Sequence, residues 1–185
     1  MLLQDFVRAI ADAVVAADAK EPVQGKYAPG IGPHTESRTI DLALAEVPPE
    51  AGWVSSVRRE VPYPNSSELC DVVMPGDWAM EFKLMRMLRN NGGVEPTMVA
   101  HIISPYEGSA VTDCVKLAAS SFAERRAVVI IGYDYDGYPL EPLTAAFEAV
   151  AAQHVELGSR AEAPFDGLGH PHHRRGKVMA WQVRG

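Results

Sequence analysis

Residues 70–86 read CDVVMPGDWAMEFKLMR, and this stretch decides the fold. Two short runs rich in strand-forming residues flank Pro75-Gly76-Asp77, whose residue types favour a tight turn. The pattern predicts an antiparallel hairpin with a three-residue turn, in which Met74 faces Trp78. Because side chains alternate between the two faces of a strand, this register decides which residues of the hairpin meet.

The predicted register brings two carboxylates together. It places Asp71 directly opposite Glu81 with Cβ atoms about 5 Å apart on one face of the sheet, and it places Lys83 on the same face. The opposite face would then carry Cys70, Val72, Met80 and Phe82. A slip of one residue would separate the carboxylates onto opposite faces.

This arrangement suggests a divalent cation. Two facing carboxylates raise each other's pKa unless a cation lies between them. Mg²⁺ (or Mn²⁺) favours such oxygen ligands, completed by water and substrate phosphate. A lysine beside the metal can position or deprotonate the attacking water. Asp71, Glu81 and Lys83 therefore fit metal-dependent phosphodiester hydrolysis. The alternative is an exposed sheet face on which Glu81 and Lys83 are ordinary surface charges.

The rest of the chain predicts an α/β domain. Apolar spacing indicates helices and strands in alternation. The expected helices cover 2–19, 36–47, 109–124 and 140–157, and the expected strands cover 57–63, 69–74, 78–84, 127–133 and 177–183. Residues 21–34 are rich in glycine and proline and predict a loop, and residues 90–107 have no firm assignment. We expect a mixed β-sheet of about five strands, flanked by α-helices on both faces.

Length and composition limit the class of protein. The 185 residues suit one domain, and the net charge of −7 argues against indiscriminate binding of polyanions, although a local basic groove is compatible with it. No apolar run is long enough to cross a membrane, and the first residues lack a signal-peptide pattern. Cys70 and Cys114 match no disulfide or zinc motif, so we expect a cytoplasmic protein.

The hairpin also resembles a known family. Asp71 in one strand, a Pro-Gly turn and Glu81-Phe82-Lys83 in the next are similar to the motif of the PD-(D/E)xK nuclease superfamily, which has the restriction-endonuclease-like fold. Cys70 stands where that motif has proline. The likeness in element order covers about residues 36–135. It implies one nuclease-like domain over 1–185, with helix 2–19 and the helix and strand of 140–183 packed on this core.

The resemblance implies a Mg²⁺- or Mn²⁺-dependent endonuclease, with DNA a more probable substrate than RNA. Asp71 and Glu81 would hold the metal, and Lys83 would act on the attacking water. Many members of the superfamily carry another acidic residue on the helix before the strands. Glu36 is the candidate here and Glu46 the second choice, although a glutamate in a first helical turn also stabilises the helix without any catalytic role. Loops, a homodimer or a protein partner would supply specificity.

A basic segment precedes the last predicted strand. Residues 167–177 read GLGHPHHRRGK. Its cations Arg174, Arg175 and Lys177 are candidates for contact with substrate phosphate. The three histidines, His170, His172 and His173, form a weak zinc pattern because they lack an acidic partner and helical spacing. The alternative is a solvated loop.

Two other functions stay open from the sequence. A non-catalytic protein of the same fold that binds nucleic acid or a protein partner agrees with the net charge of −7. A histidine-based metallohydrolase acting on a small molecule is the third hypothesis.

Overall fold

The predicted hairpin is confirmed. The computed structural model describes residues 1–23, 28–64, 66–106 and 108–185. In it β2 (Leu69–Met74) and β3 (Trp78–Met85) run antiparallel, with Met74 opposite Trp78. Gly76 in the turn has φ +76°, which a residue with a Cβ rarely adopts. The turn chemistry therefore sets the register that the sequence predicts.

The described residues form a mixed sheet of seven strands, more than the five expected. The strand order is β1-β2-β3-β4-β7-β5, and β6 also pairs with β7. Among the strands of the described residues, only β3 and β4 pair in parallel. The other strands are β1 (Arg58–Pro62), β4 (Arg125–Tyr133), β5 (Glu156–Leu157), β6 (Ala161–Phe165) and β7 (Gly176–Arg184). The two extra strands are β5 and β6. The helix expected over 140–157 ends at Ala151, so β5 forms where helix was expected, and β6 lies in the stretch before the last expected strand, to which no strand was assigned.

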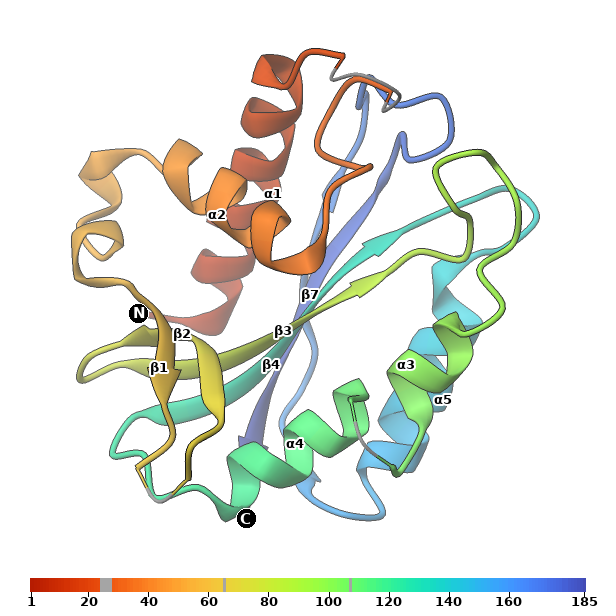
Figure 1. Ribbon diagram of the computed structural model, residues 1–185. Helices are drawn as coiled ribbons and strands as arrows, with labels where there is room; N and C mark the ends of the chain where they lie inside the picture. The colour runs from red at the N-terminus through yellow and green to blue at the C-terminus, as the bar shows by residue number, and fades with distance from the viewer. Residues whose placement is uncertain (24–27, 65, 107) are drawn as a thin grey trace.

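Helices cover both faces of this sheet, as expected (Figure 1). One face carries α1 (Leu3–Lys20) and α2 (Glu36–Glu46). The other carries α3 (Met98–Ile103), α4 (Ala110–Ala119) and α5 (Leu140–Ala151). Two 3₁₀ turns, Pro49–Ala51 and Val54–Ser56, connect α2 to β1. Among the described residues, no helix is long and apolar enough to cross a membrane.

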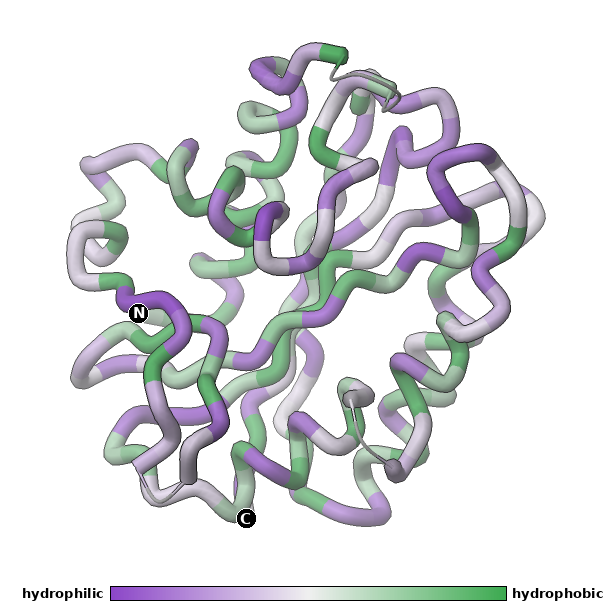
Figure 2. The backbone as a smooth tube through the Cα atoms, viewed as in Figure 1, coloured by the Kyte–Doolittle hydropathy of each residue, from purple (hydrophilic) through white to green (hydrophobic). Residues whose placement is uncertain are grey.

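Two apolar cores lie on the two sides of the sheet. Much of the length of the central strands consists of hydrophobic residues (Figure 2). Residues 127–131 of β4 are completely buried because helices cover both faces of that strand. Cys70 and Cys114 are both buried and free.

Several element boundaries differ from the prediction. The helix expected over 109–124 ends at Ala119, where Arg126 donates to the carbonyls of residues 117, 118 and 120. The unassigned stretch 90–107 contains α3, although residue 107 lies outside the described residues. Residues 24–27 of the predicted loop 21–34 also lie outside them.

Candidate functional site

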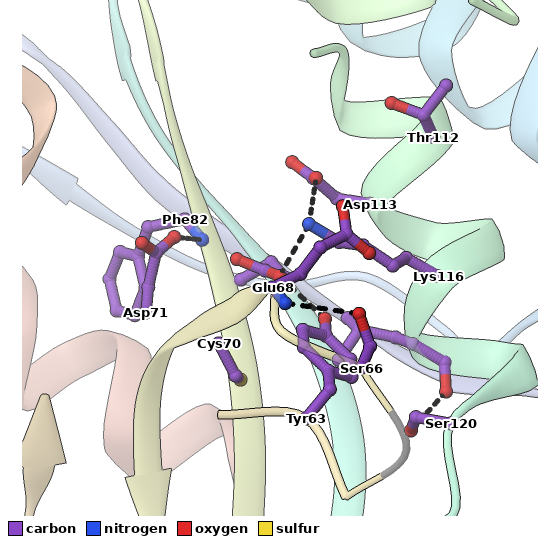
Figure 3. Close-up of polar contacts among 12 residues, drawn as sticks. Tyr63, Ser66, Glu68, Cys70, Asp71, Phe82, Thr112, Asp113, Lys116 and Ser120 are labelled. Atoms are coloured by element: carbon purple, nitrogen blue, oxygen red, sulfur yellow. Dashed lines mark hydrogen bonds and ion pairs between the residues drawn. The ribbon is translucent and has the colours of Figure 1, made fainter. Parts of the chain in front are cut away.

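The site begins where β2 separates from β3. Counted from the turn, the last regular pair between the two strands joins Val72 to Met80, and Asp71 is the first residue of β2 beyond it. At this point the hydrogen bond to β3 comes from a side chain and not from the backbone of β2: Oδ2 of Asp71 accepts a hydrogen bond of 2.8 Å from the Phe82 amide (Figure 3). On the other side of β2, Glu60 of β1 has φ +52°, so the regular strand conformation is interrupted there as well.

This break changes which residues share a face. Val72, Met80 and Phe82 pack with the α1 and α2 side, as expected, but Cys70 packs with the α3–α5 side, so its predicted orientation is wrong. The Asp71 carboxylate lies against the edge of β3 and does not face Glu81 across a regular ladder. The reason is local, because strict alternation holds only while the strands remain paired.

Glu36 reaches the same edge of β3 from α2. Thr35 caps the helix, so Glu36 is its first residue. Oε2 of Glu36 accepts a hydrogen bond of 2.8 Å from the Leu84 amide, and Oε1 lies 3.6 Å from Nζ of Lys83. Glu46 is at the far end of α2, paired with Lys20. The structure thus brings Glu36, and not Glu46, to the hairpin.

Glu81 and Lys83 point to the other side, toward α4. Nζ of Lys83 lies 2.8 Å from Oδ2 of Asp113, and Nζ of Lys116 lies 3.0 Å from Oε1 of Glu81. The same ammonium group of Lys116 is 3.2 Å from Oδ1 of Asp113. Figure 3 shows Asp113 and Lys116 reaching from α4 toward the strands.

Asp113 and Lys116 are therefore functional candidates that the sequence reasoning missed. They lie three residues apart on a helix whose apolar stripe includes Val111 and Cys114, so both can face the sheet. An acidic and a basic residue at this spacing, next to a buried stripe, is the signal that could have identified them.

Burial and crowding change the proton affinity of these groups. Burial, together with the negative charges of Asp113 and Asp71, raises the pKa of Glu81 to about 8. The hydrogen bond of 2.6 Å from the Tyr63 hydroxyl and the charge of Lys116 only partly oppose this shift. Burial also raises the pKa of Glu36, against the opposing charge of Lys83. The site thus places carboxylates where ionisation is costly.

The surroundings of Lys83 favour its charged form, whereas those of Glu81 and Glu36 favour the neutral form. Burial alone would lower the pKa of Lys83, but the carboxylates of Asp113 and Glu36 outweigh burial and raise it. Lys83 therefore stays protonated and acts as a fixed cation between two helices. Its role on the attacking water remains a prediction.

The acidic side chains of this cluster could serve as ligands of a divalent cation. The cluster combines four carboxylates with two ammonium groups, which leaves two negative charges when all are ionised: Glu36, Asp71, Glu81, Asp113, Lys83 and Lys116. This charge and the all-oxygen donor set suit Mg²⁺ or Mn²⁺. However, no group of three or more histidine, cysteine or acidic side chains is already arranged as a metal site in the described part of the chain. A cation held by two of these carboxylates, with water as its other ligands, therefore fits the cluster.

Pockets open on both sides of this cluster. One of about 440 Å³ is lined by Glu36, Leu84, Arg86, Arg89 and His101. The other, of about 1100 Å³, is lined by Tyr106, Thr112, Asp113 and Lys116. Because Lys83 contacts both Glu36 and Asp113, the cluster lies between the two pockets.

The basic segment near the C-terminus is not part of the cluster. Arg175 pairs with Asp134 and Asp136, and Lys177 lies 2.7 Å from Glu162. Arg174 is exposed and lines a separate pocket together with Arg175. A role of Arg174, Arg175 and Lys177 in phosphate contact remains a prediction.

The histidines of this segment are more buried than a solvated loop would allow. His170 and His173 are completely buried and stack with ring centroids 4.3 Å apart. His173 lies 2.7 Å from the Tyr135 hydroxyl and 3.2 Å from Oδ1 of Asn90. These contacts indicate a structural role for His173, and the solvated-loop interpretation is wrong for both rings.

Comparisons with protein-family models, with curated proteins and with solved structures found no match to this chain.

Proposed function

We propose that this protein is a metal-dependent nuclease of the PD-(D/E)xK, restriction-endonuclease-like type. The observation that carries the proposal is the cluster at the point where β2 leaves β3. Asp71 and Glu36 accept hydrogen bonds from amides of β3, Lys83 joins Glu36 to Asp113, and Lys116 joins Asp113 to Glu81. The mixed sheet with helices on both faces agrees with that fold.

The residues divide the work in this proposal. Asp71 and Glu81 would hold Mg²⁺ or Mn²⁺, which supplies a Lewis acid for the phosphate and lowers the pKa of bound water. The Phe82 amide fixes Asp71, and the Leu84 amide fixes Glu36, so both carboxylates are oriented by the backbone of β3. Lys83 keeps its positive charge and can stabilise the negative charge that grows on the phosphoryl oxygens.

The test is a cleavage assay on single- and double-stranded DNA and RNA with Mg²⁺ or Mn²⁺. We expect cleavage of at least one substrate, and chelation of the metal should abolish it. Asp71→Asn removes a charge at constant size and should lower the rate by at least 10²-fold. Asp12→Asn is the matched control, since Asp12 is exposed on α1. Cleavage that survives chelation would contradict the metal-dependent mechanism.

One observation favours a second function, a nuclease-like protein that binds without cutting. Each carboxylate of the cluster already has a protein partner: Asp71 and Glu36 have backbone amides, and Glu81 and Asp113 have lysines. Such a satisfied network can serve stability alone. Binding of nucleic acid by wild type with no cleavage of any substrate in the panel would favour this function.

A further inference from the structure

The pocket beside α4 extends the candidate site. We call it the α4 groove, lined by Glu68, Pro105, Tyr106, Thr112, Asp113 and Lys116. Its volume of about 1100 Å³ leaves room for more than one nucleotide. Because Lys116 lines the groove and contacts both Glu81 and Asp113, the groove opens directly beside the carboxylates.

The two lysines of the cluster occupy different environments. Lys83 is held between Glu36 and Asp113, and its side chain is only 17% exposed. The Lys116 side chain is 27% exposed and lines the α4 groove as well as a second pocket beside Tyr63. Lys116 is thus the cation that an incoming anion can reach, while Lys83 organises the carboxylates.

An exposed aromatic ring stands in the same groove. Tyr106 is 79% exposed, and its backbone amide is tied to Oγ of Ser104 at 3.1 Å. Folding leaves most of this residue exposed, which is unusual for an aromatic side chain. An aromatic ring beside a lysine is the combination with which proteins hold unpaired bases and their phosphates.

We propose that the α4 groove is a subsite for an unpaired nucleotide, with Lys116 on its phosphate and Tyr106 stacked on its base. This inference rests on the proposed nuclease function and names its substrate class as single-stranded nucleic acid. Bases within a duplex present no free face to a side chain, so stacking on Tyr106 requires an unpaired strand.

The first test measures binding of a short single-stranded oligonucleotide and of its duplex, by fluorescence anisotropy with Ca²⁺ to prevent cleavage. Wild type should prefer the single strand. Tyr106→Ser should weaken that binding by about 5- to 100-fold, the range expected for one lost stacking contact, and Tyr106→Phe should retain it. Val99→Ser is the control, because Val99 is an exposed apolar residue of α3 that does not line the α4 groove.

The second test concerns the phosphate contact. Lys116→Met should weaken binding and lower the slope of affinity against salt by about one unit, whereas Lys116→Arg should restore most of both. Lys20→Met is the control, because Lys20 is an exposed lysine at the end of α1 that pairs with Glu46 of α2 and does not line the α4 groove.

The outcomes separate the two proposals. If wild type cuts nucleic acid and Asp71→Asn does not, but Tyr106→Ser and Lys116→Met bind single strands like wild type, the subsite is wrong and the nuclease stands. Equal affinity of wild type for duplex and single strand would also overturn the subsite. If wild type neither binds nor cuts, both proposals fail.

Discussion

Lys83 links carboxylates that come from helices on opposite faces of the sheet. Its ammonium group is 2.8 Å from Asp113 of α4 and 3.6 Å from Glu36 of α2. Removing one partner of a buried ion pair costs about 3–5 kcal/mol, because the other charge is left without compensation. The partial exposure of Lys83 and the presence of Lys116 beside Asp113 reduce that cost here.

We expect Lys83→Met to lower the free energy of unfolding by about 2 kcal/mol without metal, and to lower cleavage by about 10²- to 10⁴-fold. Lys83→Arg, which keeps the charge, should recover most of the stability. Urea denaturation and initial cleavage rates measure the two effects. Unchanged stability in Lys83→Met would mean that this lysine is an ordinary surface charge.

His170 and His173 are buried in their neutral forms. Burial, with smaller effects of neighbouring positive groups, lowers the pKa of His170 to about 4 and of His173 to about 3. The amide of Asn90 donates to Pro33, so its oxygen faces His173, and Nε2 of that ring must donate. Nδ1 of His170 accepts from two backbone amides, so its proton is also on Nε2.

The sign of the pH dependence follows from these shifts. The unfolded chain takes up protons on both rings near pH 6.5, and the folded chain does not until about pH 4. Their contribution to stability is therefore complete above pH 6.5 and is lost as the pH falls, down to about 4 for His170 and about 3 for His173. Nitrogen-15 spectra of the imidazoles should show both rings neutral, as the Nε2–H tautomer, at pH 5.5. A charged ring at that pH would contradict this assignment.

The loop before α2 is the element that places Glu36. Arg86 donates to the carbonyls of Gly32 and His34, with 3.0 Å to the latter, and Asn90 donates to Pro33. The loop is therefore held by hydrogen bonds to the segment that follows β3. His173 packs closely against it from the C-terminal segment.

Gly32→Ala should disturb the loop before α2. A Cβ at Gly32 would lie 2.6 Å from Cβ of His173, so the loop or the ring must move. We expect a loss of about 1–3 kcal/mol in stability and a lower cleavage rate, because Glu36 follows four residues later. Gly137→Ala is the matched control, since nothing lies within 4 Å of its added Cβ. Equal effects of the two substitutions would exclude a role of this loop in placing Glu36.

The hairpin register was predictable because it depends on local turn chemistry. The turn at Pro75–Asp77 determines which residues of β2 and β3 pair, and those residues are adjacent in the sequence. The orientation of Cys70 was not predictable from the turn. It depends on the point where the regular pairing of β2 with β3 stops and the Asp71 side chain bonds to the Phe82 amide instead. Asp113 and Lys116 were missed for the same kind of reason, since their partners Lys83 and Glu81 lie 30 and 35 residues earlier in the chain.

At the scale of the whole molecule, the cluster joins the two helical layers across the sheet. Glu36 belongs to one layer and Asp113 to the other, and both contact Lys83. A cation bound to this cluster would bind the native state only, and binding of that kind adds to global stability.

Mg²⁺ or Mn²⁺ should therefore raise the melting temperature of the entire chain. At a concentration of about 100 times the dissociation constant, the added stability is about 2.7 kcal/mol. Asp71→Asn should reduce this response, and Asp12→Asn should not. Differential scanning fluorimetry with and without chelator measures it. A full metal response in Asp71→Asn would point to a cation site elsewhere.

Both margins of the sheet are interrupted. At one margin β1 contains Pro62 and the left-handed Glu60, and at the other two short strands, β5 and β6, replace one long strand, with Pro164 inside β6. Proline removes a backbone donor, and short or bent strands offer few consecutive ones. A second molecule therefore finds no long row of free amides to extend the sheet. The fold resists edge-to-edge aggregation even though its central strands are strongly apolar.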